Sequence, residues 1–210
     1  MKIVKQSADI IAPFDEDNWR EQLRLIEYAG RIAYKSEDKM TDESYHSFLK
    51  MIVDRGHLAV IEFGHMTVHF VTDRGISHEI VRHRLCSFVQ ESTRYCNYGK
   101  DKFGSEVTFI KPSSIGGVEE SVWKAACYES EKAYLCMLDK GVTPQQARSV
   151  LPNSLKTEII VKANFREWRH IFQLRAISKA AHPDMRALMI PLYQQCRKIC
   201  PEVFEMGEPE

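Results

Sequence analysis

The chain has 210 residues, and its 29 Lys and Arg residues balance its 29 Asp and Glu residues, so the formal net charge is zero. This length suits one domain with a full hydrophobic core. The neutral balance argues against a dedicated nucleic-acid binder, which usually carries a basic excess. No apolar run of about 18 residues is present, so the sequence predicts no membrane span.

The start of the chain, MKIVKQSADII, has too short an apolar core for a signal peptide. The six cysteines form no C-x-x-C pair, which disfavours a zinc ribbon or a redox dithiol. We therefore expect a cytoplasmic protein with free, mostly buried thiols rather than a disulfide framework.

Hydrophobic periodicity predicts the secondary structure, because helices repeat apolar residues at three- and four-residue spacing and strands alternate them. Helices interspersed with a few strands indicate an α+β class, and no repeat or linker divides the chain. In chain order, the expected elements are helices over 18–35 and 42–55, a strand over 66–71, a helix over 74–86, a strand over 106–111, a helix over 118–140, a short helix opened by Thr143-Pro144, a strand over 157–163, and helices over 165–180 and 183–199.

Some of these elements carry expected details. Met66, Val68 and Phe70 share one face of their strand. The long helix over 118–140 carries its apolar positions at Val122, Ala125, Ala126, Ala133 and Met137. Gly56 and Gly141 are the expected stops of the helices before them.

The sequence lacks the common motifs for nucleotide binding and for metal binding. Neither G-x-G-x-x-G nor a P-loop occurs, so a nucleotide would have to be held by side chains and helix ends. His78 and His83 are five residues apart and would not share a metal on a helix. His65 and His69 share a strand face, but no third ligand is placed, so we predict no metal site.

The densest chemical signal is Arg82-His83-Arg84 followed by Ser92. On the expected helix these three residues fan out by about 100° each, so they would serve two ligands, or one ligand and a neighbouring subunit. A solvated basic helix end is the alternative. Ser92 lacks the flanking glycines of a nucleophile elbow and is better explained as a phosphate contact.

A second basic set begins with Arg148 and continues at the expected strand-to-helix junction, where Asn164 and Arg166 stand beside backbone N–H groups that suit an anion. Arg169 and His170 lie about one turn after Arg166, and Arg175 follows. A helix held by structural salt bridges is the alternative explanation of this segment.

Together these residues resemble the flavin-dependent thymidylate synthases, the ThyX family. Its RHR-x7-S signature matches Arg82-His83-Arg84 and Ser92, and its GH-x4-E segment resembles Gly56-His57 to Glu62. Two later segments, AR-x-LP and NxR…LR, resemble the stretches that begin at Ala147 and Asn164. The match covers residues 20–200.

The resemblance implies one catalytic domain over 1–210, with a small, mostly antiparallel sheet flanked by helices. It also implies a methyltransferase that converts dUMP to dTMP with FAD as cofactor, NADPH as reductant and methylenetetrahydrofolate as one-carbon donor. The expected assembly is a homotetramer with shared sites and no nucleic-acid or membrane partner.

Carried over by position, the resemblance also assigns site residues, with Arg175 and Arg82 as the catalytic pair. The dUMP-binding positions are Glu79, Arg82, Gln90, Glu91, Ser92, Thr93, Arg94, Arg148 and Arg175. The FAD-binding positions are His65, Arg82, His83, Arg84, Gln90, Asn164, Phe165, Arg166 and His170.

Four positions depart from the family pattern. Phe63 replaces a common His, Glu79 a Gln, Gln90 a Glu, and Thr93 a Gly beside the expected phosphate. These departures leave open a second hypothesis, a non-catalytic nucleotide-binding protein that keeps the same scaffold.

Overall fold

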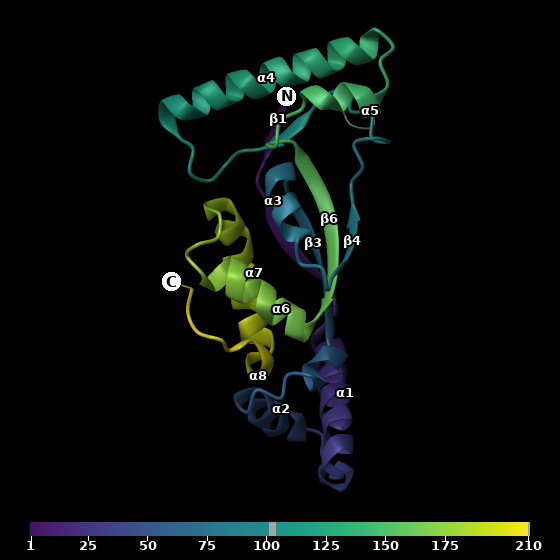
Figure 1. Cartoon of the computed structure of the whole chain (residues 1–210), viewed down its shortest axis with the longest axis vertical. Helices are drawn as coiled ribbons and strands as arrows, with labels where there is room; N and C mark the ends of the chain where they lie inside the picture. Colours follow the sequence, from purple (N-terminus) through teal and green to yellow (C-terminus); the bar gives the residue numbers. More distant parts are fainter. Residues whose placement is uncertain (101–103, 210) are drawn as a thin grey trace. The chain divides into compact units, whose positions relative to one another are not determined.

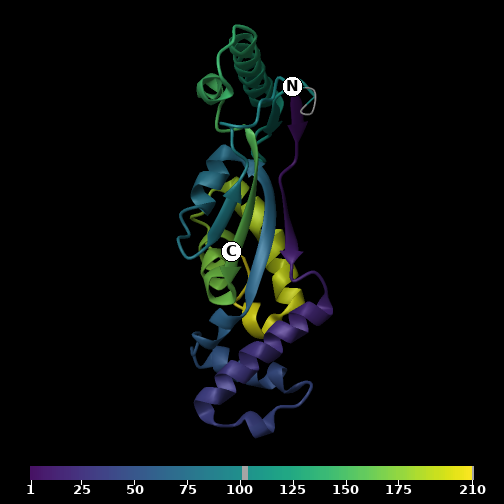
Figure 2. The ribbon, with the colours of Figure 1, turned by 90° about the vertical axis from the view of Figure 1, so that its right-hand side faces the viewer.

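The computed structural model describes residues 1–100 and 104–209, which form two compact units, and each unit is described by itself. Colour along the chain in Figures 1 and 2 shows that each unit gathers segments distant in sequence. The first unit comprises Met1–Ser7, Phe70–Arg82 and Val89–Ile159, and the second comprises Ala8–His69, His83–Phe88 and Ile160–Glu210.

Four strands, β2 (Ser7–Ala12), β3 (His65–Asp73), β6 (Lys156–Asn164) and β4 (Ser87–Gln90), form one sheet in that order. The predicted α+β class with a small antiparallel sheet is confirmed. The alternation predicted for β3 is also confirmed, because Met66, Val68 and Phe70 are all fully buried. The short strands β2 and β4 were not predicted.

In the first unit, β1 (Lys2–Val4) pairs in parallel with β5 (Thr108–Ile110). The long helix α4 (Gly117–Asp139) lies against the short α5 (Pro144–Ala147), as both views show (Figures 1 and 2). The core beneath them consists of Tyr98, Val107, Phe109, Cys127, Tyr134, Ala147 and Leu155.

The buried face of α4 differs from the predicted one. Val122 is 66% exposed, and the residues turned inward are Cys127, Glu131 and Tyr134. Glu131 accepts a hydrogen bond from the backbone N–H of Val107 at 2.7 Å and pairs with the chain's N-terminal ammonium at 3.1 Å. The buried Glu131 carboxylate fixes which face of α4 turns toward the core, so the alanine-rich face remains exposed.

In the second unit, α1 (Glu16–Tyr34) begins where the Asp15 side chain accepts a hydrogen bond from the backbone N–H of Asn18 at 2.8 Å. α1 packs on α2 (Ser44–Asp54). The contact needs a glycine, because a Cβ at Gly30 would meet the Phe48 ring at 2.6 Å.

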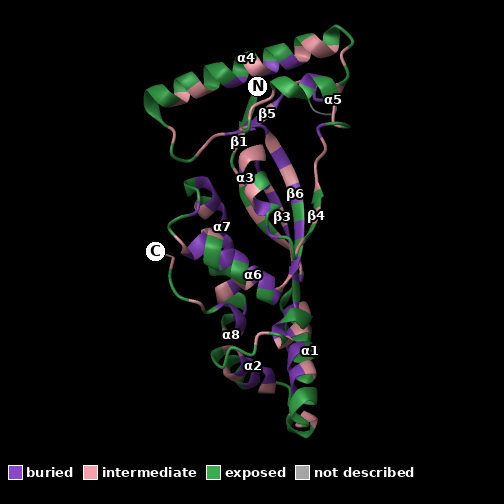
Figure 3. Cartoon of the chain, in the orientation of Figure 1, coloured by how far each residue is buried: buried purple, intermediate pink, exposed green. Residues whose placement is uncertain are grey.

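The core of the second unit is aromatic and lies between α6 (Phe165–Phe172), α7 (Pro183–Ile199) and α8 (Pro201–Phe204). Phe165 stacks on Trp19 with ring centroids 5.5 Å apart and meets Phe204 edge-on at 5.4 Å. Figure 3 shows buried residues gathered on α6 and α7. The remaining elements are η1 (Glu37–Lys39), η2 (Val60–Phe63), α3 (Arg74–Ile80), η4 (Arg148–Val150) and the π-helical segment η5 (Gln173–Ile177).

All six cysteines are free thiols, as expected, but only three of them are buried, whereas most were expected to be. Within residues 1–100 and 104–209, no helix has both the length and the apolarity needed to cross a membrane. The expectation of one domain over 1–210 stays a prediction.

Candidate functional site

The sequence-predicted site residues divide between the two units. The dUMP set lies in the first unit except for Arg175, and the FAD set lies in the second unit except for Arg82 and Gln90. Each unit therefore carries most of one predicted ligand set.

The Arg82-His83-Arg84 segment is not helical, which corrects the expected helix over 74–86. α3 ends at Ile80, and the last helical bonds run from the N–H groups of Val81 and Arg82 to the carbonyls of Ser77 and Glu79. Arg82 and Arg84 are exposed, whereas His83 is only 6% exposed. Contacts between buried His83 and residues distant in sequence outweigh the local preference for continuing the helix. The predicted 100° spacing of Arg82, His83 and Arg84 around a helix therefore does not apply.

In the first unit, Gln90 and Glu91 are held by neighbouring side chains. Gln90 donates from Nε2 to the hydroxyls of Ser77 at 2.9 Å and Thr157 at 3.2 Å. The Glu91 carboxylate accepts from the Tyr98 hydroxyl at 2.7 Å and pairs with Lys156 at 3.2 Å. Burial, reinforced by Glu91, raises the pKa of Tyr98. Glu91 is thus engaged in a structural network.

The residues after Glu91 form a turn. The carbonyl of Ser92 accepts from the backbone N–H groups of Tyr95 and Cys96, and the Ser92 hydroxyl accepts from the N–H of Arg94 at 3.3 Å. The Arg94 guanidinium lies 5.6 Å from the centre of the Tyr95 ring, and both side chains are exposed.

Thr93 connects this turn to the AR-x-LP segment. Arg148, at the end of α5, donates from Nη1 to the Thr93 hydroxyl at 2.9 Å. Thr93 is only 6% exposed, whereas Arg148 is exposed. A buried hydroxyl therefore anchors one end of an exposed guanidinium.

In the second unit, β6 gives way to α6 at Asn164, as predicted. The Asn164 side chain caps α6 by accepting from the N–H of Glu167 at 2.8 Å, and the N–H of Phe165 donates to Gly64 at 2.9 Å. Two of the backbone donors expected to serve an anion are therefore used within the chain. The fully buried Phe165 ring belongs to the core, so it is not available to a ligand.

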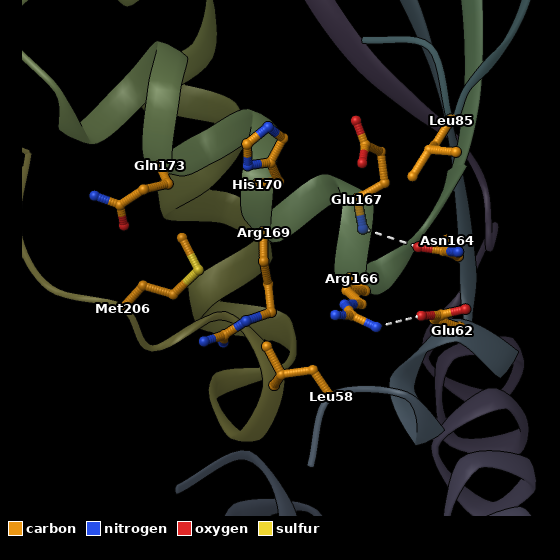
Figure 4. A pocket seen from close by; sticks show the side chains of 10 residues that line it. All are labelled: Leu58, Glu62, Leu85, Asn164, Arg166, Glu167, Arg169, His170, Gln173 and Met206. Carbon is orange, nitrogen blue, oxygen red and sulfur yellow. Dashed lines mark hydrogen bonds and ion pairs between the residues drawn. The ribbon is translucent and has the colours of Figure 1, made fainter. Parts of the chain in front are cut away.

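A cavity of about 700 Å³ opens beside α6, within the size range of sites for small molecules and cofactors. Arg166 crosses its wall and pairs with Glu62 at 2.6 Å, which joins the GH-x4-E and NxR segments across the chain (Figure 4). The lining residues are Leu58, Glu62, Leu85, Asn164, Arg166, Glu167, Arg169, His170, Gln173 and Met206.

Glu167 and Arg169 also line this cavity; the sequence placed Arg169 in the second basic set without assigning it to a ligand, and did not single out Glu167. Arg169 donates to the carbonyl of Val203, and burial lowers its pKa. Glu167 is 7% exposed, and burial raises its pKa although His170 opposes the shift. Their positions beside Arg166 and His170 on one short helix were the available signal.

His83 and Arg175 meet in the second unit. Arg175 donates from Nε to Nε2 of His83 at 3.2 Å, and Oε1 of Glu167 lies 3.6 Å from Nδ1 of the same ring. Burial first, and then the nearby positive charges of Arg175 and His170, lower the pKa of His83 to about 4.

Arg175 lies in the π-helical segment η5, where the N–H of Ser178 donates to the carbonyl of Gln173 at 3.1 Å. An i to i+5 turn holds one more residue than an α-helical turn. The π-helical segment therefore interrupts the predicted regular helix over 165–180, which is α-helical only as far as Phe172. The sequence pattern did not predict this interruption.

His65 opens β3, where its backbone N–H donates to the side chain of Gln22 at 2.6 Å, and the residue is exposed. Among the residues that the structure describes, no three His, Cys, Asp or Glu side chains are grouped so that they could hold a metal ion.

Residues 16–202 match a protein-family model described as "Thymidylate synthase complementing protein". The chain is 32% identical over 193 residues to a protein of Geobacter sulfurreducens named flavin-dependent thymidylate synthase, covering 88% of this chain and 81% of that protein. A protein of the same name from Mycobacterium sp. strain KMS is 35% identical over 205 residues, covering 86% and 78% of the two chains.

A solved structure also matches. The UMP/dUMP methylase PolB from Streptomyces cacaoi, bound with 5-Br dUMP, superposes with a TM-score of 0.80 at 19% identity. The superposition covers 98% of this chain and 96% of that one. At this identity the likeness shows a shared fold.

Proposed function

Because this chain belongs to the flavin-dependent thymidylate synthase family, we propose that it is a methyltransferase that reductively methylates dUMP to dTMP. FAD is the proposed cofactor, methylenetetrahydrofolate the one-carbon donor and NADPH the reductant. The observation that carries this proposal is that side-chain contacts join the family-like segments. Glu62–Arg166 and His83–Arg175 connect three of them, and Thr93, the residue after Ser92, contacts Arg148 of the fourth.

The first unit supplies the proposed nucleotide-binding groups. Arg148, held by Thr93, and the Ser92 hydroxyl suit a phosphate, since guanidinium and hydroxyl groups both donate hydrogen bonds to phosphate oxygens. The exposed guanidinium groups of Arg82 and Arg94 add positive charge. Gln90 and Glu91, which are engaged within the unit, are proposed to shape this site rather than to move toward a ligand.

The second unit supplies a cavity whose lining fits FAD. Arg166, Arg169 and His170 offer nitrogen donors for a diphosphate, whereas Leu58, Leu85 and Met206 offer apolar surface for flat rings. Asn164 adds an amide beside them. The exposed His65 and Arg84 are proposed to complete the set of FAD-binding residues. Phe165 is proposed to act only by packing α6 against the core.

The chemistry that FAD supplies when bound is hydride transfer. The protein's own task is to raise the electron density at carbon 5 of the uracil ring. A guanidinium at the N3/O4 edge stabilises the negative charge that develops there, the electrostatic form of catalysis. We assign this role to Arg175, assisted by Arg82.

The proposed assembly is a cytoplasmic homotetramer. Exposed apolar side chains on α4 support a contact between subunits, because Val118 is 77% exposed and Val122 is 66% exposed on the same helix face. Light scattering tests this point directly: a tetramer of the 24.3 kDa chain has about four times that mass.

The purified protein is expected to carry the visible absorption of a flavin and to form dTMP from dUMP, methylenetetrahydrofolate and NADPH. It is also expected to rescue a bacterial strain that requires thymidine. A protein that binds FAD and dUMP yet forms no dTMP and gives no rescue would contradict this proposal and support the non-catalytic alternative, which the departures at Phe63, Glu79 and Thr93 favour.

A further inference from the structure

His83, the middle residue of the Arg82-His83-Arg84 segment, does not present its ring to a ligand. Its side chain is 6% exposed, and Nε2 lies 3.2 Å from Nε of Arg175. Since a guanidinium is always protonated and can only donate, Nε2 must be the acceptor of this hydrogen bond. The ring nitrogen nearest the guanidinium therefore carries no proton.

A neutral imidazole whose Nε2 accepts must carry its proton on Nδ1. Oε1 of Glu167 lies 3.6 Å from this nitrogen, too far for a hydrogen bond but close enough to favour a proton there. The carboxylate therefore selects the tautomer that leaves Nε2 free to accept. The result is an ordered row of Glu167, His83 and Arg175.

Three ionisable groups that contact the ring belong to the second unit. Glu167 and His170 come from α6, and Arg175 comes from η5. The His170 ring meets the His83 ring edge-on, with centroids 6.0 Å apart and planes at 76°. Burial, followed by the charges of Arg175 and His170, holds the pKa of His83 near 4, so the ring is neutral at physiological pH.

We propose that His83 is a positioning residue, which fixes the plane of the Arg175 guanidinium through Nε2 and is itself held in the correct tautomer by Glu167. This inference rests on the proposed function for the role of Arg175. It differs from the positional expectation that His83 binds FAD. The geometry on both sides of the ring supports it, because Nε2 accepts from Arg175 while Oε1 of Glu167 lies on the Nδ1 side.

Three variants are expected to differ in turnover. His83→Gln keeps an acceptor on a side chain of similar reach, whereas His83→Leu removes it, and His78→Gln is a control at an exposed histidine on α3. We expect His83→Leu to lower kcat roughly 10- to 100-fold at saturating dUMP with its flavin content retained. His83→Gln should recover most of that loss, and His78→Gln should match the wild type.

A second readout does not depend on activity. Nitrogen NMR of the histidine rings, assigned by the signal that disappears in His83→Gln, should show His83 neutral, with its proton on Nδ1 down to about pH 5. Arg175→Ala should raise its pKa, because a positive neighbour has been removed.

The two readouts separate the two proposals. If the wild type forms no dTMP, the proposed function fails, and the NMR result alone decides the pairing of His83 with Arg175. If His83 titrates near 6.5 and is unmoved by Arg175→Ala, the positioning role is overturned. Full kcat in His83→Leu, or a His83→Gln protein no better than a folded His83→Leu protein, would overturn it as well.

Discussion

The exposed guanidinium of Arg148 donates to the buried hydroxyl of Thr93, at a distance of 2.9 Å between Nη1 and Oγ1. At the position of Thr93 the family commonly has a glycine, which could not make this contact. In this chain, therefore, a side chain stiffens a residue that we place at the phosphate of dUMP.

Thr93→Val keeps the shape of the threonine and removes its hydroxyl. Because a hydrogen bond to a charged group contributes about 1.5–3 kcal/mol, we expect KM for dUMP to rise roughly tenfold with kcat little changed. Thr93→Ser is the matched control and should retain a KM near that of the wild type. Steady-state kinetics checks both, and an unchanged KM in Thr93→Val would refute the anchoring role.

Arg166 and Glu62 form an ion pair on the wall of the cavity, with side chains 53% and 44% exposed. A pair exposed to this degree contributes little to stability, about 0–1 kcal/mol. We therefore expect Arg166→Ala to weaken FAD binding at least tenfold, as measured by flavin fluorescence, while the urea midpoint hardly moves.

An exposed ion pair elsewhere in the second unit provides the comparison. Arg24→Ala breaks the pair with Asp42, whose atoms lie 3.1 Å apart, and should leave FAD binding unchanged. Equal losses of FAD in the two variants would argue against a specific role for Arg166.

Arg175→Ala should abolish dTMP formation and leave the fold intact. Loss of one preorganised charge-stabilising group costs on the order of 100- to 1000-fold in kcat, so residual turnover should be near the detection limit. Circular dichroism and flavin content serve as controls for folding. Turnover close to that of the wild type would remove Arg175 from the catalytic pair.

The free energy of unfolding should depend on pH through His83. Its pKa is about 4 in the folded protein against an ordinary value of 6.5, so on acidification the unfolded chain takes up the proton first. The contribution of neutral His83 to the free energy of unfolding is fully present above pH 6.5. It is lost as the pH falls from 6.5 through 4, and its upper limit is on the order of 3 kcal/mol.

Urea titrations of the wild type and His83→Gln at pH 7 and pH 4.5 test this dependence. The wild type should lose more stability between the two values than the variant, because glutamine does not titrate. Equal losses in both proteins would mean that another group is responsible.

Where burial follows local periodicity, the sequence predicted the fold well. The helix that begins near Glu16 and the strand carrying Met66, Val68 and Phe70 repeat their apolar residues at the spacing that their buried faces require. Both elements are present within two residues of the predicted ends.

Where contacts distant in sequence decide the local structure, the prediction failed. The expected helix over 74–86 stops at Ile80, because His83 is held by residues about 90 positions away. Glu131 turns the long helix by binding the backbone of Val107, and no apolar count reveals a buried carboxylate of this kind. The same limit hid the π-helical turn at Arg175, which differs from an α-helical turn by one residue.

The chain passes between its two units five times, at Arg82–His83 and inside β2, β3, β4 and β6, so neither unit is a continuous stretch of sequence. No single cut, and no choice of start and stop codons, yields one unit without severing a strand. The groups proposed for dUMP and those proposed for FAD are therefore inherited together. A gene fusion or an exon exchange could transfer the whole chain, but it could not transfer one of the two sets of binding groups without the other.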